Sequence, residues 1–465
     1  MSESTGGTKA APRNPIVVLL LILLLAAALT YVLDSGSYQR QNGLVVPGSY
    51  QTLEKDRSLL HLAGTVKDAP QGEARPVGLA DVFMAIPQGL QRGGGLIFMV
   101  LIIGGMFGIL RASGAVDAGL ERMLSIVRGN VYGLVVFLMT IFALGSTFLG
   151  LASEYLLIIP LMVEMVRRLG MPPLIGLAIV TVAVKVGYLS SVTNPLPLTI
   201  AQPLLGLPVF SGAAMRAVFF VCFLLIGVMF VLYMIRKTGF HVSTDAEHTA
   251  KRLSRRHLFM LLTLLAGVAG LVHASTAWHW HNPQLTAYYL ALCVLLSAIS
   301  GMGASAAADA FVAGMKKILL AAILIGLAMA IAITLENGRV LDSVVHGLVA
   351  MVGGDNPYLA ALGMFASQLL LDVMIPSTSG QAAVSMPILG PLGQLSGVSA
   401  QTTVLAFLFG NGITNMITPT SGTLLAYLAT AQVGWTQWAR FIAPLVLIFS
   451  GMAAVMLMVA VSVGY

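Results

Sequence analysis

Three ionisable residues, Glu154, Lys185 and Asp372, lie inside long apolar segments of this 465-residue sequence. A charge at membrane depth is costly, so it is usually paired or contacts a substrate or an ion. Glu154 is our first candidate for contacting a cationic substrate group or a coupling ion. Lys185 has open interpretations: it anchors a carboxylate, stands in for a cation, or forms a structural ion pair with Glu154 or Asp372. For Asp372, near the mouth of a hairpin, a structural role is favoured.

Each of these charges stands beside a run of Gly, Ser, Thr, Asn and Pro that interrupts an apolar stretch. The four interrupted stretches are residues 131–169, 174–207, 357–392 and 400–431. Proline removes a helical donor, and the small polar residues supply turns and replacement hydrogen bonds. Irregular backbone inside a membrane is tolerated only where it is buried in protein or lines a cavity. The breaks therefore indicate a cavity, although small residues also occur at tight helix–helix contacts.

The ends of half-helices that meet at such breaks can bind ions of either sign. Helix N-termini attract a carboxylate, and carbonyl oxygens freed at helix C-termini suit Na+ or another cation. We expect the substrate-binding residues to be Ser153, Glu154, Lys185, Ser190, Ser191, Thr193, Asn194, Thr378, Ser379, Gly380, Asn411, Thr414, Asn415, Thr418, Thr420 and Ser421. A Na+ coupling ion is expected near four of them, namely Ser190, Asn194, Asn411 and Asn415.

The second half of the chain repeats the first. The segment Ala-Asp-Val-Phe-Met-Ala at 80–85 returns as Ala-Asp-Ala-Phe-Val-Ala at 308–313, an offset of 308 − 80 = 228 residues. Further pairs at nearly the same offset are Gly114 with Gly338, Pro160 with Pro387, Pro195 with Pro419, and Arg216 with Arg440. A duplication of this kind is typical of secondary transporters. The two arginines are expected to be loop or interface anchors.

The composition indicates a polytopic membrane protein. The chain is 57% hydrophobic and only 9% charged, against roughly 25% charged in ordinary globular proteins. The net charge of +7 comes from Lys and Arg in short loops, as orientation signals do, so no nucleic-acid partner is inferred. Cys222 and Cys293 lie in apolar runs, which predicts neither a disulfide framework nor a metal cluster.

We predict an all-α fold with about nine transmembrane helices, two re-entrant hairpins and two broken helices. Uninterrupted spans are expected at 16–33, 93–111, 214–236, 257–273, 285–302, 316–335 and 437–463. The hairpins are 131–169 and 357–392, and the broken crossings are 174–207 and 400–431. The basic residues between 237 and 256 place the N-terminus in the cytoplasm and the C-terminus in the periplasm. Under this topology the two halves are inverted copies.

The domain organisation follows from the repeat. It comprises a disordered N-terminus (1–15), a first helix with an exported loop (16–79), repeat one (80–236), a cytoplasmic linker with connecting helices (237–307) and repeat two (308–465).

Several motifs together carry a family resemblance. They are Gly150-Leu151-Ala152-Ser153-Glu154, Ser190-Ser191-Val192-Thr193-Asn194-Pro195, Thr378-Ser379-Gly380-Gln381-Ala382-Ala383 and Gly410-Asn411-Gly412. In this order they resemble the YfcC-like branch of the C4-dicarboxylate anaerobic carrier and basic amino-acid antiporter group, within the ion transporter superfamily. The resemblance implies a homodimer with a scaffold and a mobile transport domain, which works as an elevator. It also implies basic amino acids as substrates, although Ser153 stands where similar proteins carry a second acidic residue.

The leading functional hypothesis is a secondary active transporter of amino acids in the bacterial inner membrane, coupled to Na+, protons or a counter-substrate. The alternatives are a transporter of C4-dicarboxylates, other carboxylates or peptides, and an ion channel. An enzyme is not expected, because the sequence has no His-Glu-x-x-His zinc motif. A Gly-rich loop ending in Gly-Lys-Ser/Thr is also missing, which disfavours an ATP-driven pump.

Overall fold

A computed structural model describes residues 15–465 except 42–43, 59–61, 63–72, 127–129, 240–253, 279, 281, 351 and 353–355. The expected disordered N-terminus and most of the expected cytoplasmic loop lie outside these described residues. Within them the chain is mostly helical, with a few short strands before the first repeat.

The first helix, α1 (Pro15–Val32), matches the predicted anchor, and a short polar segment with five strands follows it. The strands are β1 (Ser35–Ser37), β2 (Arg40–Gln41), β3 (Leu44–Val45), β4 (Gln51–Lys55) and β5 (Glu73–Ala74). β1 pairs antiparallel with β4, β4 pairs parallel with β5, and β2 and β3 form a hairpin. Arg40 pairs with Asp342 at 2.6 Å, which fixes this segment to the start of repeat two. Burial and the nearby Asp342 carboxylate raise the pKa of Tyr38 in the same segment to about 12.

The two repeats contain corresponding elements in the same order, except that α12 of repeat two corresponds to α2 and α3 together and that η3 has no counterpart among the described residues. Repeat one has α2 (Leu79–Arg92), α3 (Gly94–Ala112), α4 (Ala115–Ile126), α5 (Val131–Leu149), η3 (Ser153–Leu157), α6 (Ile159–Arg168), α7 (Pro173–Ser190), α8 (Pro195–Leu204) and α9 (Ala213–Lys237). Repeat two has α12 (Ala304–Asn337), α13 (Leu341–Ala350), α14 (Pro357–Met374), α15 (Thr378–Leu395), α16 (Ala400–Thr414), α17 (Gly422–Thr430) and α18 (Trp435–Ser462). The helices α10 (Arg255–Ala277) and α11 (Asn282–Ser300) connect the two repeats.

The corresponding long helices of the two repeats pack against each other in opposite directions. A Cβ on Gly108 would lie 2.1 Å from the Ala310 carbonyl oxygen, and one on Gly104 would meet Ile318, further along α12. Residue numbers on α2 and α3 therefore rise while those of their partners on α12 fall. Glycine at this contact lets the two backbones touch, which is the usual way that membrane helices pack tightly. The antiparallel pairing is the relation that an inverted repeat requires.

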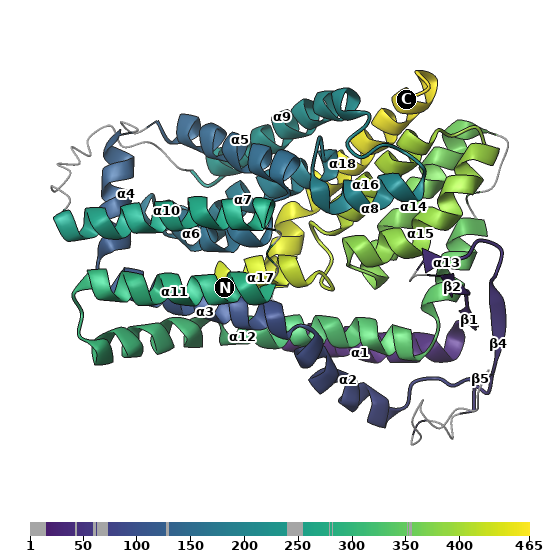
Figure 1. The fold of residues 1–465 in the computed structure, drawn as a ribbon, viewed down its shortest axis with the longest axis horizontal. Helices are drawn as coiled ribbons and strands as arrows, with labels where there is room; N and C mark the ends of the chain where they lie inside the picture. The colour runs from purple at the N-terminus through teal and green to yellow at the C-terminus, as the bar shows by residue number, and fades with distance from the viewer. Residues whose placement is uncertain are drawn as a thin grey trace, which may run out of the picture.

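The helices form two groups, which Figure 1 shows along its lower and upper edges. α12 packs on α1, α2 and α3, and α11 packs on α3; we call these helices the scaffold group. α5 and α9 pack on α7, while α14 and α18 pack on α16; we call these, with α6, α8, α15 and α17, the hairpin group. α17 contacts α12 and α3, so it lies at the boundary between the groups.

The structure refines the expected elements in three places. The predicted span 316–335 is the second half of α12, which begins at Ala304. The short helices α2, α4 and α13 were not predicted. In the described part of the chain, eight helices are long and apolar enough to cross a membrane, including the first arms of both hairpins. The count of nine crossings stays a prediction.

Candidate functional site

Each hairpin packs the end of its first arm, α5 or α14, against the broken crossing that follows it in the sequence. In repeat one, the Ser146 hydroxyl donates to the carbonyl of Val184 at 2.8 Å. The Thr147 hydroxyl accepts from the backbone N–H of Val192 at 3.0 Å. A Cβ on Gly187 would lie 2.5 Å from the carbonyl oxygen of Ala143, so only glycine fits there. The first hairpin is thus bonded directly to the first break.

The second hairpin makes the same contact with the second break. A Cβ on Gly410 would lie 2.4 Å from the Cβ of Gln368 on α14. The Thr414 hydroxyl donates to the carbonyl of Leu369 at 3.0 Å, and the Thr420 hydroxyl donates to that of Val373 at 2.8 Å. The two breaks are placed equivalently in the two repeats.

The breaks are shorter than the sequence indicated. The first covers residues 191–194 between α7 and α8, and the second covers residues 415–421 between α16 and α17. Gly187 and Ser190 are still helical and lie near the end of α7, as Gly410 and Thr414 do near the end of α16. The first hairpin tip begins only at Gly150, where α5 has ended. Gly187 and Gly410 serve close helix packing, because a larger side chain would clash with the neighbouring helix.

A fully buried carboxylate, Asp372 of α14, lies beside the second break. The Nδ2 of Asn411 donates to its Oδ1 at 2.6 Å. The Nδ2 of Asn415 donates to both carboxylate oxygens at 2.8 Å. Hydrogen bonds to a carboxylate stabilise its ionised form, and they orient both amides towards the charge. Asp372 therefore lies in a polar site built by side chains of α16. The sequence had favoured a structural role for it near the hairpin mouth.

A chain of amides continues from Asp372 into the second hairpin. Asn411 Nδ2 also donates to Gln381 Oε1 at 2.6 Å, and Gln381 Nε2 donates to Gln368 Oε1 at 2.8 Å. The Ser385 hydroxyl donates to the same Gln368 oxygen at 3.2 Å. Gln368 Nε2 is buried and has no hydrogen-bond partner among the described residues. The sequence analysis missed this chain, although three polar residues in apolar helices were a visible signal.

Repeat one contributes Tyr188 and Lys185 to the same cluster. The Tyr188 hydroxyl donates to Asn411 Oδ1 and lies 2.6 Å from the Thr378 hydroxyl. The Lys185 Nζ lies over the Tyr188 ring at 5.9 Å from its centroid. Lys185 is 7% exposed and interacts electrostatically with Asp372. No carboxylate of the described residues lies within 4.0 Å of the ammonium, so the two charges face each other without a contact ion pair.

Four expected site residues belong to the first break. The Ser190 hydroxyl donates to the carbonyl of Val186 at 2.9 Å, and that of Ser191 donates to the carbonyl of Tyr188. The Thr193 hydroxyl donates to Phe148 O at 3.3 Å, which ties it to the first hairpin. Asn194 caps α8 by accepting from Leu196 N at 3.0 Å, while its buried Nδ2 has no partner among the described residues. An anion at the start of α8 would find this free donor.

The remaining residues expected around the second break have structural contacts. The Thr418 and Thr420 hydroxyls lie 2.7 Å apart, and Ser421 caps α17 by accepting from Leu424 N at 3.3 Å. Ser379 and Gly380 lie in the first turn of α15, beside the cap residue Ser377. Of all the residues expected from the sequence, the structure gathers Lys185, Thr378, Asn411 and Asn415 around Asp372.

Ser153 and Glu154 form the tip of the first hairpin, in η3. Glu154 is 7% exposed, and its carboxylate accepts from the backbone N–H of Ala152 at 2.8 Å. Its charge acts on Tyr289 of α11 and Tyr427 of α17. The hydroxyl of Tyr427 donates to the carbonyl of Ala152 at 2.6 Å. Glu154 thus lies at the boundary between the hairpin and scaffold groups, and the electrostatic partner of Lys185 is Asp372.

Carbonyls freed at the breaks accept hydrogen bonds from side chains, and the expected Na+ site stays a prediction. In the first break, Arg216 donates to the carbonyls of Ser191 at 3.0 Å and Val192 at 3.1 Å. In the second, the indoles of Trp438 and Trp435 donate to the carbonyls of Met416 and Ile417, both at 2.8 Å. Of the four residues expected near Na+, Ser190 and Asn194 lie at the first break, and Asn411 and Asn415 lie at the second.

An architecture of two inverted hairpin repeats around a buried polar site is typical of membrane transporters. A model of the C4-dicarboxylate anaerobic carrier family matches residues 14–462, so the chain belongs to that family.

Two relatives match most of the chain. The Escherichia coli protein YfcC, provisionally named a basic amino acid antiporter, is 28% identical over 420 residues, which are 85% of this chain and 83% of YfcC. An uncharacterised Haemophilus influenzae protein is 24% identical over 436 residues, 90% of this chain and 82% of that protein.

Two solved structures have a comparable length. The YdaH transporter of Alcanivorax borkumensis has a TM-score of 0.42 and 18% identity, covering 97% of this chain and 99% of that one. MtrF of Neisseria gonorrhoeae, from a class described as antimetabolite efflux pumps, has a TM-score of 0.43 and 16% identity, covering 97% and 95%.

Proposed function

We propose that this chain is a secondary active transporter of amino acids in which the hairpin group moves as an elevator against the scaffold group. The observation that carries the proposal is the buried Asp372, held by Asn411 and Asn415 and opposed by Lys185 from the other repeat. Ionisable groups at such depth usually mark a transport pathway. Because both repeats contribute to the cluster, a substrate bound there would contact the two broken crossings together.

The charges of the site suit an amino acid in its zwitterionic form. The start of α8 offers the positive end of the helix dipole and the unpartnered Nδ2 of Asn194, both of which favour a carboxylate. Asp372 favours an ammonium group. Since Lys185 already balances Asp372, a substrate with a net positive charge would bring an excess cation into the site. We therefore favour zwitterionic over dibasic amino acids.

Coupling follows from the cost of leaving a buried carboxylate alone. An unpaired buried charge is destabilising by several kcal/mol, so Asp372 needs a cation in every state of the cycle. We propose that Lys185 supplies it when the site is empty, and that the substrate ammonium, a proton or Na+ competes with Lys185 when the site is loaded. The Lys185 ammonium would then move away from Asp372 only when the substrate ammonium, a proton or Na+ binds there.

A second candidate is a C4-dicarboxylate, as the family description states. Lys185 favours it, because its ammonium has no contact carboxylate in the described part of the chain. Asp372 disfavours it by repulsion of the second carboxylate. The net preference depends on which of the two charges the substrate meets.

Uptake into proteoliposomes tests the proposal. We would measure the flux of radiolabelled zwitterionic, basic and dicarboxylate substrates under imposed Na+, proton and counter-substrate gradients. We expect saturable uptake and counterflow of a zwitterionic amino acid, lost in Asp372→Asn with its fold intact. Large passive currents without saturation would instead show a channel. Transport of dicarboxylates alone would favour the second candidate, and no flux under any gradient would contradict both.

We also propose the bacterial inner membrane as the location, with a cytoplasmic N-terminus and a homodimeric assembly. The loop charges support this orientation. Accessibility of single cysteines, placed at Ser2 and beside the strands at Ser49, to a membrane-impermeant reagent tests it. Labelling of Ser2→Cys in intact spheroplasts would contradict the orientation, as would protection of Ser49→Cys. Light scattering of the detergent-solubilised protein would show whether two copies associate.

A further inference from the structure

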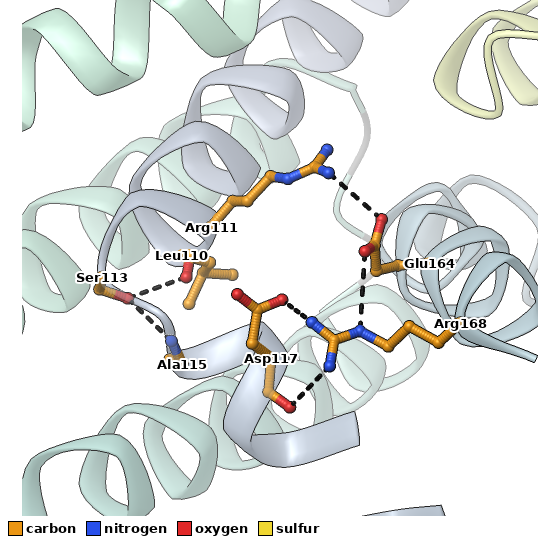
Figure 2. Close-up of polar contacts among 7 residues, drawn as sticks. All are labelled: Leu110, Arg111, Ser113, Ala115, Asp117, Glu164 and Arg168. Atoms are coloured by element: carbon orange, nitrogen blue, oxygen red, sulfur yellow. Dashed lines mark hydrogen bonds and ion pairs between the residues drawn. The ribbon is translucent and has the colours of Figure 1, made fainter. Parts of the chain in front are cut away.

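A cluster of charges lies where α3 and α6 end and α4 begins (Figure 2). Glu164 forms ion pairs with Arg111 at 3.5 Å and with Arg168 at 3.7 Å. Arg168 also pairs with Asp117. Figure 2 shows both carboxylates pointing at these two guanidinium groups. The negative charges of the cluster are therefore already compensated.

Two further cations beside this cluster have no such compensation. Arg167 and Lys317 are exposed, and both line a cavity of about 80 Å3 next to Arg111 and Glu164. In the described part of the chain no carboxylate lies within 4.0 Å of either. The cavity lies between the scaffold helices α3 and α12 on one side and α6 of the hairpin group on the other. It consequently has a net positive charge.

A second and larger cavity of about 250 Å3 adjoins the first and shares Lys317 with it. It lies between α12 and the junction of α17 with α18. Apart from Lys317 and Gln432 its walls are apolar, with Leu320, Leu324, Leu425 and Leu428 among them. Leu320 is 46% exposed, so the cavity opens on the surface that a membrane would cover. A pair of cations thus stands at the end of an apolar cavity.

We propose that these two cavities bind one anionic phospholipid, with its phosphate at Lys317 and Arg167 and one acyl chain among the leucines. A lipid matches both halves of the site, whereas a free anion would leave the apolar half empty. Side chains on a helix tilt towards its N-terminus, so Lys317 on α12 can reach a headgroup as snorkelling lysines do. Arg167 lies in the last turn of α6, and Lys317 lies at the start of the predicted span 316–335. Under the predicted topology both are at the cytoplasmic side, where basic pockets between helices bind anionic headgroups. A zwitterionic lipid would add its own cation to an already positive site.

The test uses the full-length protein, delipidated in a neutral detergent. Phosphatidylglycerol and phosphatidylcholine with identical acyl chains are added separately, and bound lipid is counted by native mass spectrometry beside the shift of the melting temperature. We expect phosphatidylglycerol to bind more tightly and to raise the melting temperature more. Equal binding of the two lipids would overturn the proposal. Equal stabilisation by inorganic phosphate alone would also overturn it, because it would assign the site to a free anion.

Matched variants locate the site. One lysine near a membrane surface contributes about a fivefold change in affinity for anionic lipid, so Lys317→Gln should weaken phosphatidylglycerol binding about fivefold. Lys316→Gln removes the same charge one residue away, outside both cavities, and should leave binding unchanged. Equal losses of phosphatidylglycerol binding in the two variants would show that only general surface charge matters. That result would contradict the proposed lipid site. Leu320→Trp fills the exposed edge of the apolar cavity and should weaken lipid binding while phosphate binding stays the same.

Discussion

The two broken crossings meet the same structural need with different chemistry. Each leaves two consecutive carbonyls without helical partners inside the membrane. At the first break, one buried guanidinium, that of Arg216, donates to Ser191 and Val192. At the second, two neutral indoles, Trp438 and Trp435, donate to the corresponding carbonyls. The repeat counterpart of Arg216 is Arg440, which is exposed and takes no part.

This difference gives the binding region opposite charges at its two breaks. The first break has the fixed positive charge of Arg216, and the second lies beside the Asp372 carboxylate, which accepts from two neutral amides and is opposed at a distance by Lys185. A symmetric backbone thus carries an asymmetric field. The duplication explains where polar groups are needed, but the charge at each break is a separate property of the side chains.

Replacing Arg216 should cause the largest loss of stability at either break. Arg216→Met removes the donors to four carbonyls, those of Ser191, Val192, Phe210 and Ser211. Unsatisfied buried polar groups cost about 1–3 kcal/mol each, so we expect a loss of stability of about 4 kcal/mol. Thermal unfolding in detergent measures it. Arg440→Met is the matched control, with an expected change below about 0.5 kcal/mol; similar losses in both would contradict the role of Arg216.

Asp372→Asn should have the next largest effect. It leaves Lys185 without its opposing charge and replaces one acceptor oxygen with an NH2 donor that faces the donors of Asn411 and Asn415. We expect a loss of about 3 kcal/mol in stability and of transport by on the order of a hundredfold. The double variant Lys185→Met with Asp372→Asn should regain stability but not transport. If the double variant is less stable than either single one, the two charges are not coupled as we propose.

At the second break, the loss of one indole should cost less than the loss of the guanidinium. Trp438→Phe keeps most of the apolar volume but leaves the Met416 carbonyl without its donor. The expected loss is about 1–2 kcal/mol, measured by the same unfolding assay. Trp280→Phe, in the polar connection before α11, provides a control at a site outside both breaks. A loss as large as that of Arg216→Met would remove the distinction between the two breaks.

Glu154→Gln should have the smallest effect on the fold. The Gln side chain keeps an oxygen that can accept from Ala152 N, so stability should change by less than about 1 kcal/mol. The lost charge should lower substrate or ion affinity severalfold, seen as a higher KM in uptake. Unchanged kinetics would exclude the role that the sequence assigned to Glu154 and leave the charge asymmetry to Asp372 and Arg216.

Much of the fold was predictable because its signals are local. The four interrupted stretches correspond to two hairpins and two broken crossings, and the spacing of proline and glycine located them. The limits of the breaks were less predictable, since glycine serves both turns and close packing. Gly187 and Gly410 lie inside helices and provide packing contacts. Short helices such as α4 and α13 were missed because they are too short to give a periodic signal.

The site was only partly predictable, because its contacts join residues far apart in the sequence. Lys185, Asn411 and Asn415 were expected from their position beside the breaks. Asp372 was underestimated, since a single sequence does not show that amides about 40 residues away surround it. The indole donors of repeat two were missed for the same reason: tryptophan near a helix end is ordinarily read as a membrane-interface anchor.

The close approach at Gly187 and Gly410 has a consequence for mutational tolerance. In a library of all single variants sorted for correctly inserted protein, these two positions should accept no residue larger than glycine. Polar positions that bond neither to a freed carbonyl nor to Asp372, such as Glu154, should accept more replacements, at a cost mainly in transport. Under our proposal, the substrate preference can change through exchanged polar side chains. The close contact between each hairpin and its crossing stays the same, because it requires glycine.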